Sequence, residues 1–233
     1  MATPIIALDV ATSAEALDLV DRLGDTVGFY KIGSPLFTAA GPQVIREVRA
    51  RDKRVFLDLK FHDIPNTVAR AVEAAARMQV DLLTVHTTGG LPMLKAAREA
   101  AGDQGPRVLG VTVLTSFGAE EIHQAWGKEV RSVREEVTRL AALAVEAELP
   151  GVVASPLEAE QIRRRHGSNL IIVTPGIRPS GDAVADQVRI ATPADAARAG
   201  ADFIVIGRPV IAAADPLEVM GRVMAELAKA RAA

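Results

Sequence analysis

Eight short apolar runs recur along the chain, and a longer segment with helical character follows each of them. The runs are rich in Val, Ile and Leu and occupy Ile5–Val10, Gly28–Gly33, Arg54–Lys60, Leu82–Thr87, Arg107–Leu114, Gly151–Ser155, Leu170–Thr174 and Asp202–Gly207. The residues between successive runs leave room for one helix each. This alternation predicts an α/β fold built on a parallel sheet.

Helix-capping patterns fall between the predicted strands. Thr12-Ser13-Ala14-Glu15 and Ser155-Pro156-Leu157-Glu158 have the capping-box pattern, and Thr192-Pro193-Ala194-Asp195 is similar. Gly24 and Gly200 come just after apolar-periodic segments, where a left-handed residue ends a helix. These signals predict helices in the segments that separate the strands.

Eight strand–helix units in 233 residues predict a closed (β/α)8 TIM barrel. The length suits one large domain or two small ones, and we expect a single barrel domain over residues 1–233. An open doubly wound sheet is the alternative, but it normally carries a glycine-rich phosphate-binding sequence after its first strand. The segment Asp9-Val10-Ala11-Thr12 is not such a sequence, which favours the closed barrel.

The composition narrows the class of ligand. Hydrophobic residues make up 49%, charged residues 24% and the formal net charge is −2, as in an ordinary soluble globular protein. The 27 Lys and Arg are scattered among 29 Asp and Glu, so we expect a small-molecule ligand and no nucleic-acid partner. No apolar run approaches the roughly 20 residues that span a bilayer, so no membrane association is expected.

The absence of cysteine excludes disulfides, zinc–thiolate sites and thiol nucleophiles, and favours a cytoplasmic location. The N-terminal segment lacks a basic region and reaches a charge at Asp9, so we predict no signal peptide. The 4 histidines include no His-x-His or His-x-x-x-His pair. We therefore predict no metal site, expect His86 to be structural and assign no role to His62.

Polar residues stand where the predicted strands end, the edge that carries the active site in such barrels. They are Asp9, Lys31, Asp58, Lys60, His86, Thr115, Arg178 and Arg208. Charges at the mouth of an apolar strand are costly to bury unless they are paired. We therefore expect the charged members of this set to form one network.

The third predicted strand and the loop after it carry the largest group of closely spaced charged residues. Asp58 and Lys60 are two residues apart, which predicts that both side chains face the barrel interior while Leu57 and Leu59 face the helices. Asp63 follows in the loop before Pro65, so two carboxylates and an ammonium are expected to converge. The bare pattern Asp-x-Lys-x-x-Asp also fits a solvated charge cluster at a strand end. Its strand position, the flanking leucines and Lys31 on the neighbouring strand favour a functional site.

This part of the chain resembles the signature of the orotidine 5′-phosphate decarboxylase family, throughout Asp58-Leu59-Lys60-Phe61-His62-Asp63-Ile64-Pro65-Asn66-Thr67. The resemblance covers the whole chain. Further segments that resemble the family, in family order, are Ala7-Leu8-Asp9, Lys31-Ile32-Gly33, Leu114-Thr115-Ser116, Thr174-Pro175-Gly176-Ile177-Arg178 and Ile206-Gly207-Arg208-Pro209. It implies a carboxy-lyase that converts orotidine 5′-phosphate to UMP, the last step of de novo pyrimidine nucleotide biosynthesis, without a cofactor.

The resemblance also implies roles for individual residues. Lys60 is the expected proton donor to C6 of the pyrimidine, Asp58 lies beside the substrate carboxylate, and Lys31 and Asp63 hold that pair in place. The residues expected to bind substrate are Asp9 and Lys31 at the ribose, Asp58 at the carboxylate, Thr115 at the base, Gln187, Gly207 and Arg208 at the phosphate, Arg178 on the same side, and Thr67. In the homodimer that the resemblance implies, Asp63 and Thr67 act across the interface.

Elementary chemistry makes these roles reasonable. Loss of CO₂ from C6 leaves a carbanion in the ring plane, which the π-system cannot delocalise, and the chain carries no motif for an electron-sink cofactor. An ammonium fixed beside C6 stabilises that charge and then delivers the proton.

Barrels also frequently bind phosphate with the loops after the seventh and eighth strands, where Arg178 and Arg208 stand. A turn with a surface arginine is the less favoured alternative for Gly207-Arg208.

Two other functions compete with this interpretation. Related barrels, such as keto-gulonate-phosphate decarboxylases and hexulose-phosphate synthases, share Asp-x-Lys-x-x-Asp but use magnesium, with a carboxylate where Lys31 stands here. An ammonium at that position repels a divalent cation. The other alternative is a non-catalytic barrel that senses nucleotides, which binds UMP without turnover.

Overall fold

The computed structural model describes residues 2–181 and 191–232, and eight parallel strands close into a barrel within them in sequence order. The strands are β1 Thr3–Ala7, β2 Phe29–Gly33, β3 Arg54–Phe61, β4 Leu82–His86, β5 Arg107–Val111, β6 Gly151–Val153, β7 Ile171–Thr174 and β8 Phe203–Ile206. All eight predicted strands and the closed barrel are confirmed. β1 pairs with both β2 and β8, so no strand is left as an edge.

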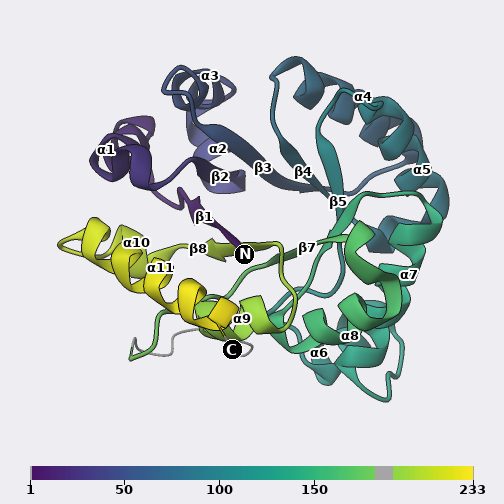
Figure 1. Cartoon of the computed structure of the whole chain (residues 1–233). Coiled ribbons are helices and arrows are strands. Elements are labelled where there is room, and N and C mark those ends of the chain that lie inside the picture. The colour runs from purple at the N-terminus through teal and green to yellow at the C-terminus, as the bar shows by residue number, and fades with distance from the viewer. Residues whose placement is uncertain (1, 182–190, 233) are drawn as a thin grey trace.

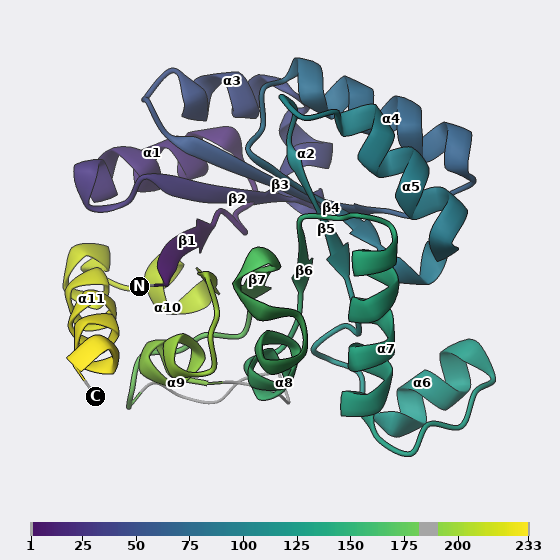
Figure 2. The ribbon, with the colours of Figure 1, turned by 45° about the vertical axis from the view of Figure 1, so that its right-hand side comes forward.

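Helices surround the barrel, as Figure 1 shows. They are α1 Ser13–Leu23, α2 Ser34–Ala40, α3 Gln43–Arg49, α4 Pro65–Arg77, α5 Gly90–Ala101, α6 Ala119–Trp126, α7 Val133–Glu146, α8 Pro156–His166, α9 Pro193–Arg198, α10 Arg208–Ile211 and α11 Pro216–Ala232, with 3-10 turns η1 Gly24–Thr26, η2 Thr87–Gly89 and η3 Gly167–Asn169. Figure 2 shows α6 outside the ring, beyond α7. None of these helices, in the part of the chain described, is both long and apolar enough to cross a membrane.

The capping interactions that the sequence predicts are present at the ends of these helices. Thr12 and Glu15 form a reciprocal capping box at α1, and Thr192 caps α9 by accepting from Asp195 N. Ser155 caps α8 through Leu157 N, with proline in the first turn. Gly24 and Gly200 follow helices with φ of 48° and 91°, the left-handed region predicted for them.

The strands bury both faces, which divides the core into two layers. Alternate residues such as Ile5, Phe29 and Phe56 fill the barrel interior. Their neighbours, such as Ile6 and Leu57, belong to the larger core between the sheet and the helices. Such two-sided burial explains why the strands are almost continuously apolar. Polar residues at inward positions are therefore exceptional, and they cluster at the carboxyl ends of the strands.

The pairing of β3 with β4 is irregular at the candidate site. Leu57 pairs with Leu83 and Phe61 with Val85, and the register shifts between these two pairs. Lys60 lies within the shift and has a φ of 52°, in the left-handed region. The prediction that Asp58 and Lys60 face the same interior is confirmed, because both line the central cavity. Lys60 reaches it from this bulge instead of from regular alternation.

Candidate active site

A cavity of about 630 Å³ opens at the carboxyl ends of the strands. Its inner wall is apolar and includes Phe56, Val153, Val173 and Val205. The predicted site residues that line it are Asp9, Lys31, Asp58, Lys60, Thr115, Arg178, Gly207 and Arg208. The barrel thus brings together charged and apolar residues from segments far apart in the sequence around one cavity.

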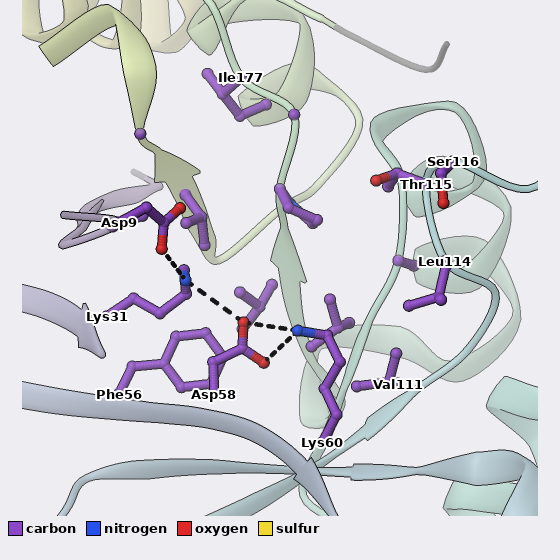
Figure 3. Close-up of a pocket in the computed structure, with 18 of the residues that line it drawn as sticks. Asp9, Lys31, Phe56, Asp58, Lys60, Val111, Leu114, Thr115, Ser116 and Ile177 are labelled. Carbon is purple, nitrogen blue, oxygen red and sulfur yellow. Dashed lines mark hydrogen bonds and ion pairs between the residues drawn. The ribbon is translucent and has the colours of Figure 1, made fainter. Parts of the chain in front are cut away.

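Four of the six charged residues that the sequence predicts in one network form a continuous series of ion pairs (Figure 3). Lys31 Nζ lies 3.0 Å from Asp9 Oδ1 and 3.6 Å from Asp58 Oδ2. Lys60 Nζ donates to both oxygens of Asp58, at 2.9 and 3.0 Å. Positive and negative groups alternate along the series, which offsets the cost of removing them from water.

Asp58 is the centre of this network. Its side chain is only 13% exposed. Burial raises the pKa of the Asp58 carboxyl, but the charges of Lys31 and Lys60 outweigh that effect, and hydrogen bonds from Lys60 and Thr84 reinforce them. The pKa of Asp58 therefore lies below its ordinary value, and the group is a carboxylate at neutral pH.

Gly33 provides room for the cation between the two carboxylates. A Cβ atom at this position would lie 3.1 Å from Lys31 Nζ and 3.4 Å from Asp9 Oδ1. The first of these contacts is tighter than ordinary packing, so a larger residue here would press on the Lys31 ammonium and shift it by a few tenths of an ångström. This close approach explains why a strand of buried bulky residues ends in glycine.

The predicted base and phosphate groups also line this cavity. Thr115 and Ser116 lie across the cavity from Asp9 and Lys31 in Figure 3, on the loop after β5. Arg178 lines the cavity after β7, and its buried Nε has no hydrogen-bond partner among the described residues. An unpaired buried donor of this kind suits a bound anion. Gln187, the remaining predicted phosphate contact, lies outside the described residues.

Asp63 and Thr67 lie apart from the cavity lining of their own chain, within the ranges described. Asp63 Oδ1 accepts a hydrogen bond from Ile64 N at 2.6 Å, and both Asp63 and Thr67 are exposed. Ile64 between them is 65% exposed, although it is a large apolar residue. Within one chain the second carboxylate that joins the network is therefore Asp9 and not Asp63.

The two histidines near the signature contact each other. Their rings lie 5.5 Å apart, and neither belongs to the described cavity lining. Burial lowers the pKa of His86, and the nearby His62 and Lys60 lower it further. His86 is therefore a neutral imidazole at neutral pH, and its structural role stays a prediction.

Sequence reasoning missed Thr84, a fully buried residue of β4. Its hydroxyl donates to Asp58 Oδ1 and accepts from Lys60 N, both at 2.9 Å. The signal was present, because Thr84 is two residues after inward-facing Leu82 and so interrupts an apolar strand at an inward position. No three His, Cys, Asp or Glu side chains come together as a metal site within the described ranges.

Comparison with known proteins places this geometry in a family. The model of the orotidine 5′-phosphate decarboxylase / HUMPS family matches residues 3–223. Orotidine 5′-phosphate decarboxylase from Moorella thermoacetica is 49% identical over 230 residues, covering 96% of this chain and 91% of the relative. The protein of the same name from Opitutus terrae is 47% identical over 225 residues, covering 96% and 97%.

A solved structure agrees over the same length. The crystal structure of orotidine 5′-phosphate decarboxylase from Lactobacillus acidophilus matches with a TM-score of 0.83 and 34% sequence identity, covering 97% of this chain and 99% of that one. The sequence match, the barrel and the charged network at its mouth point in the same direction. The chain therefore belongs to the orotidine 5′-phosphate decarboxylase / HUMPS family.

Proposed function

We propose that this chain decarboxylates orotidine 5′-phosphate to UMP, the last step of de novo pyrimidine nucleotide biosynthesis, with Lys60 as the proton donor and no cofactor. The observation that carries the proposal is the ammonium of Lys60, held 2.9 Å from a buried carboxylate at the mouth of the barrel. Full-length relatives that bear the name of this activity support it.

The proposed step needs one proton and no external electrons. The bond between C6 and the carboxylate breaks, CO₂ leaves, and the electron pair stays on C6. Lys60 Nζ stabilises that pair by its charge and then transfers a proton to C6, which leaves a neutral amine. The Lys60 side chain is 36% exposed, so water can return the proton before the next turnover.

Asp58 contributes in two ways. Its ionised oxygens fix the position of Lys60 Nζ, so little reorganisation is needed when charge develops at C6. It also brings a second negative charge close to the substrate carboxylate. That repulsion disappears as CO₂ departs, which favours the transition state over the bound substrate.

The remaining cavity groups suit the rest of the nucleotide. We assign Asp9 and Lys31 to the ribose hydroxyls, Thr115 to the base, and Gly207, Arg208 and Gln187 to the phosphate, with Arg178 beside them. Lys31 Nζ bonded to Asp9 provides both a donor and an acceptor for a diol. The unpaired Nε of Arg178 supports an anion at that end. Binding energy from the phosphate then serves the chemistry at the base.

We propose that a second copy of the chain completes each site. Asp63 and Thr67 are exposed just beyond the bulge that carries Lys60, and the exposed Ile64 between them offers apolar surface for an interface. In a two-fold homodimer this loop reaches the partner's cavity and adds Asp63 and Thr67 to it.

We also propose that residues 1–233 form one domain and act in the cytoplasm. Pairing of β1 with β8 joins the two ends of the chain in a single sheet, which supports one folding unit. The chain has no cysteine and so depends on no disulfide, which suits a reducing compartment.

The family description also includes the HUMPS group. Lys31 favours the decarboxylase over the magnesium-dependent barrels considered above, which carry a carboxylate at this position. Its ammonium stands between the carboxylates of Asp9 and Asp58. The fixed positive charge at this position repels a divalent cation.

Absorbance at the orotate band tests the proposal directly. Purified protein is treated exhaustively with a chelator, mixed with orotidine 5′-phosphate, and followed as the band disappears. We expect turnover that neither the chelator nor added Mg²⁺ changes. Activity that is lost on chelation and restored by Mg²⁺ supports the magnesium-dependent alternative, whereas UMP binding without turnover identifies a nucleotide sensor.

A further inference from the structure

The irregular pairing of β3 and β4 leaves one residue of β4 opposite the catalytic segment. Between the two regular pairs, Leu57 with Leu83 and Phe61 with Val85, β3 advances four residues while β4 advances two. Thr84 is the single β4 residue in that interval. The extra length of β3 therefore has only one side chain of β4 facing it.

Lys60 needs support at this point because its backbone is unusual. A φ of 52° is uncommon for a residue with a Cβ atom and costs about 1 kcal/mol or more, so the surroundings must hold it. The shift also separates Lys60 N–H from the carbonyls of a regular ladder. Thr84 Oγ1 accepts this N–H at 2.9 Å and so replaces the missing partner.

The proton of the same hydroxyl goes to the other catalytic residue. Thr84 Oγ1 donates to Asp58 Oδ1 at 2.9 Å, and the residue is 0% exposed, so water does not compete for either bond. A hydroxyl has one proton, and here it is committed to the carboxylate. The result is a directed series from Lys60 N–H through Thr84 to Asp58, in which each bond polarises the next.

We propose that Thr84 is a positioning residue of the decarboxylation site. Its hydroxyl fixes both the backbone from which Lys60 leaves the strand and the orientation of the carboxylate that receives Lys60 Nζ. The inference rests on the proposed function. Thr84 lies behind Asp58, outside the described cavity lining, and acts through the two groups that it joins.

Thr84→Val tests the hydroxyl because it preserves the shape of the side chain. The lost bonds serve a charged carboxylate and a strained amide, so we expect kcat to fall roughly 10- to 100-fold. UMP affinity should stay close to that of the unmodified protein, because the proposed phosphate and base contacts are untouched. Thr84→Ser keeps the hydroxyl without the methyl group and should restore kcat to near the original value.

Thr87→Val is the matched control. Thr87 is also fully buried and directly follows β4, but its Oγ1 has no hydrogen-bond partner among the described residues. The same chemical change at this position should leave kcat unchanged. A fall in kcat at Thr84 but not at Thr87 isolates the hydrogen bonds from the general effect of replacing a buried threonine.

The pH profile supplies a readout that packing alone does not move. Hydrogen bonds to the ionised form lower the pKa of a carboxyl, and Thr84 donates such a bond to Asp58. Its removal raises the pKa of Asp58, so the acid limb of kcat should move to higher pH in Thr84→Val and return in Thr84→Ser.

Four results would overturn the role proposed for Thr84. A folded Thr84→Val protein with unchanged kcat and acid limb overturns the inference, as does a Thr84→Ser protein as impaired as Thr84→Val, which indicates packing. If Thr84→Val does not fold, Thr84→Ser and Thr84→Ala differ by the one oxygen, and equal kcat values in that pair overturn the inference. Unmodified protein without turnover overturns the proposed function itself, and this inference with it.

Discussion

Lys60 and Arg208 are two cations of one cavity with different proposed tasks. Lys60 extends from β3 into the cavity, whereas Arg208 begins α10 after β8 and lines the cavity at the proposed phosphate end. Lys60→Ala should abolish turnover while UMP binding remains measurable by calorimetry. Arg208→Ala should weaken UMP binding roughly 10- to 100-fold, the effect of one lost charge-assisted contact, and change uridine binding little. Equal losses for uridine and UMP contradict the phosphate role.

The low pKa of Asp58 links the site to stability. Its carboxyl is more acidic in the folded protein than its ordinary value of 3.8, so ionisation stabilises the folded state above that pH. This contribution disappears as the pH falls below 3.8 and through the folded pKa. The difference in free energy of unfolding between the unmodified protein and Asp58→Asn should therefore shrink between pH 7 and pH 3, measured by urea denaturation. A difference that does not vary with pH contradicts the assignment.

Among single residues, the charged members of the network can be predicted from the sequence, but the threonine that positions them cannot. Asp9, Lys31, Asp58 and Lys60 are recognisable because charges interrupt apolar strands at one edge of the barrel. Thr84 is also at an inward position, but threonine is common in strands and draws no attention there. Its importance depends on the register shift opposite it, which is a property of two paired strands and not of either sequence alone.

At the scale of elements, a glycine in β6 lets three strands pack inside the barrel. A Cβ atom on Gly151 would lie 2.6 Å from the backbone oxygen of Ile171 and 2.7 Å from the side chain of Leu109. Since backbone cannot move aside easily, Gly151→Ala should lower the free energy of unfolding by about 1–3 kcal/mol. Gly28→Ala is the control, because nothing lies within 4 Å of its Cβ position. Equal urea midpoints for the two variants contradict this packing argument.

The ends of the elements were harder to predict than their order. The first strand was expected to reach Val10 and the fifth Leu114, but they end at Ala7 and Val111. Leu8 and Val113 remain buried beyond those ends, so hydrophobicity continues after the ladder has stopped. Apolar periodicity reports burial and not hydrogen bonding, which explains why it overestimates strands where they open around the cavity.

For the molecule as a whole, the proposed sharing of each site between two chains predicts complementation between two inactive variants. Lys60→Ala and Asp63→Ala proteins, each nearly inactive alone, are mixed, dissociated and allowed to reassociate. If Asp63 serves the partner's cavity, one hybrid site receives both defects and the other receives intact Lys60 and Asp63. Half of the sites in the hybrid dimers should then be active.

The composition of the mixture provides the control for this experiment. Native mass spectrometry measures the fraction of hybrid dimers, and reassociated samples of each single variant give the background activity. If both residues act within one chain, every site keeps one lesion. Hybrid dimers that form but remain inactive contradict the shared-site proposal and leave the barrel and the decarboxylase assignment intact.

The closure of the barrel also has a consequence for synthesis on the ribosome. β1 needs both β2 and β8 as neighbours, and β8 begins only at Phe203 (Figure 1). At roughly 5–20 residues per second, the about 200 residues between them take about 10–40 s to make. Throughout that time one edge of the nascent sheet lacks its partner, and such an edge invites pairing with other chains. The first strand to be made is thus the last to have both edges paired. Until β8 emerges, only other molecules can cover the free edge of β1.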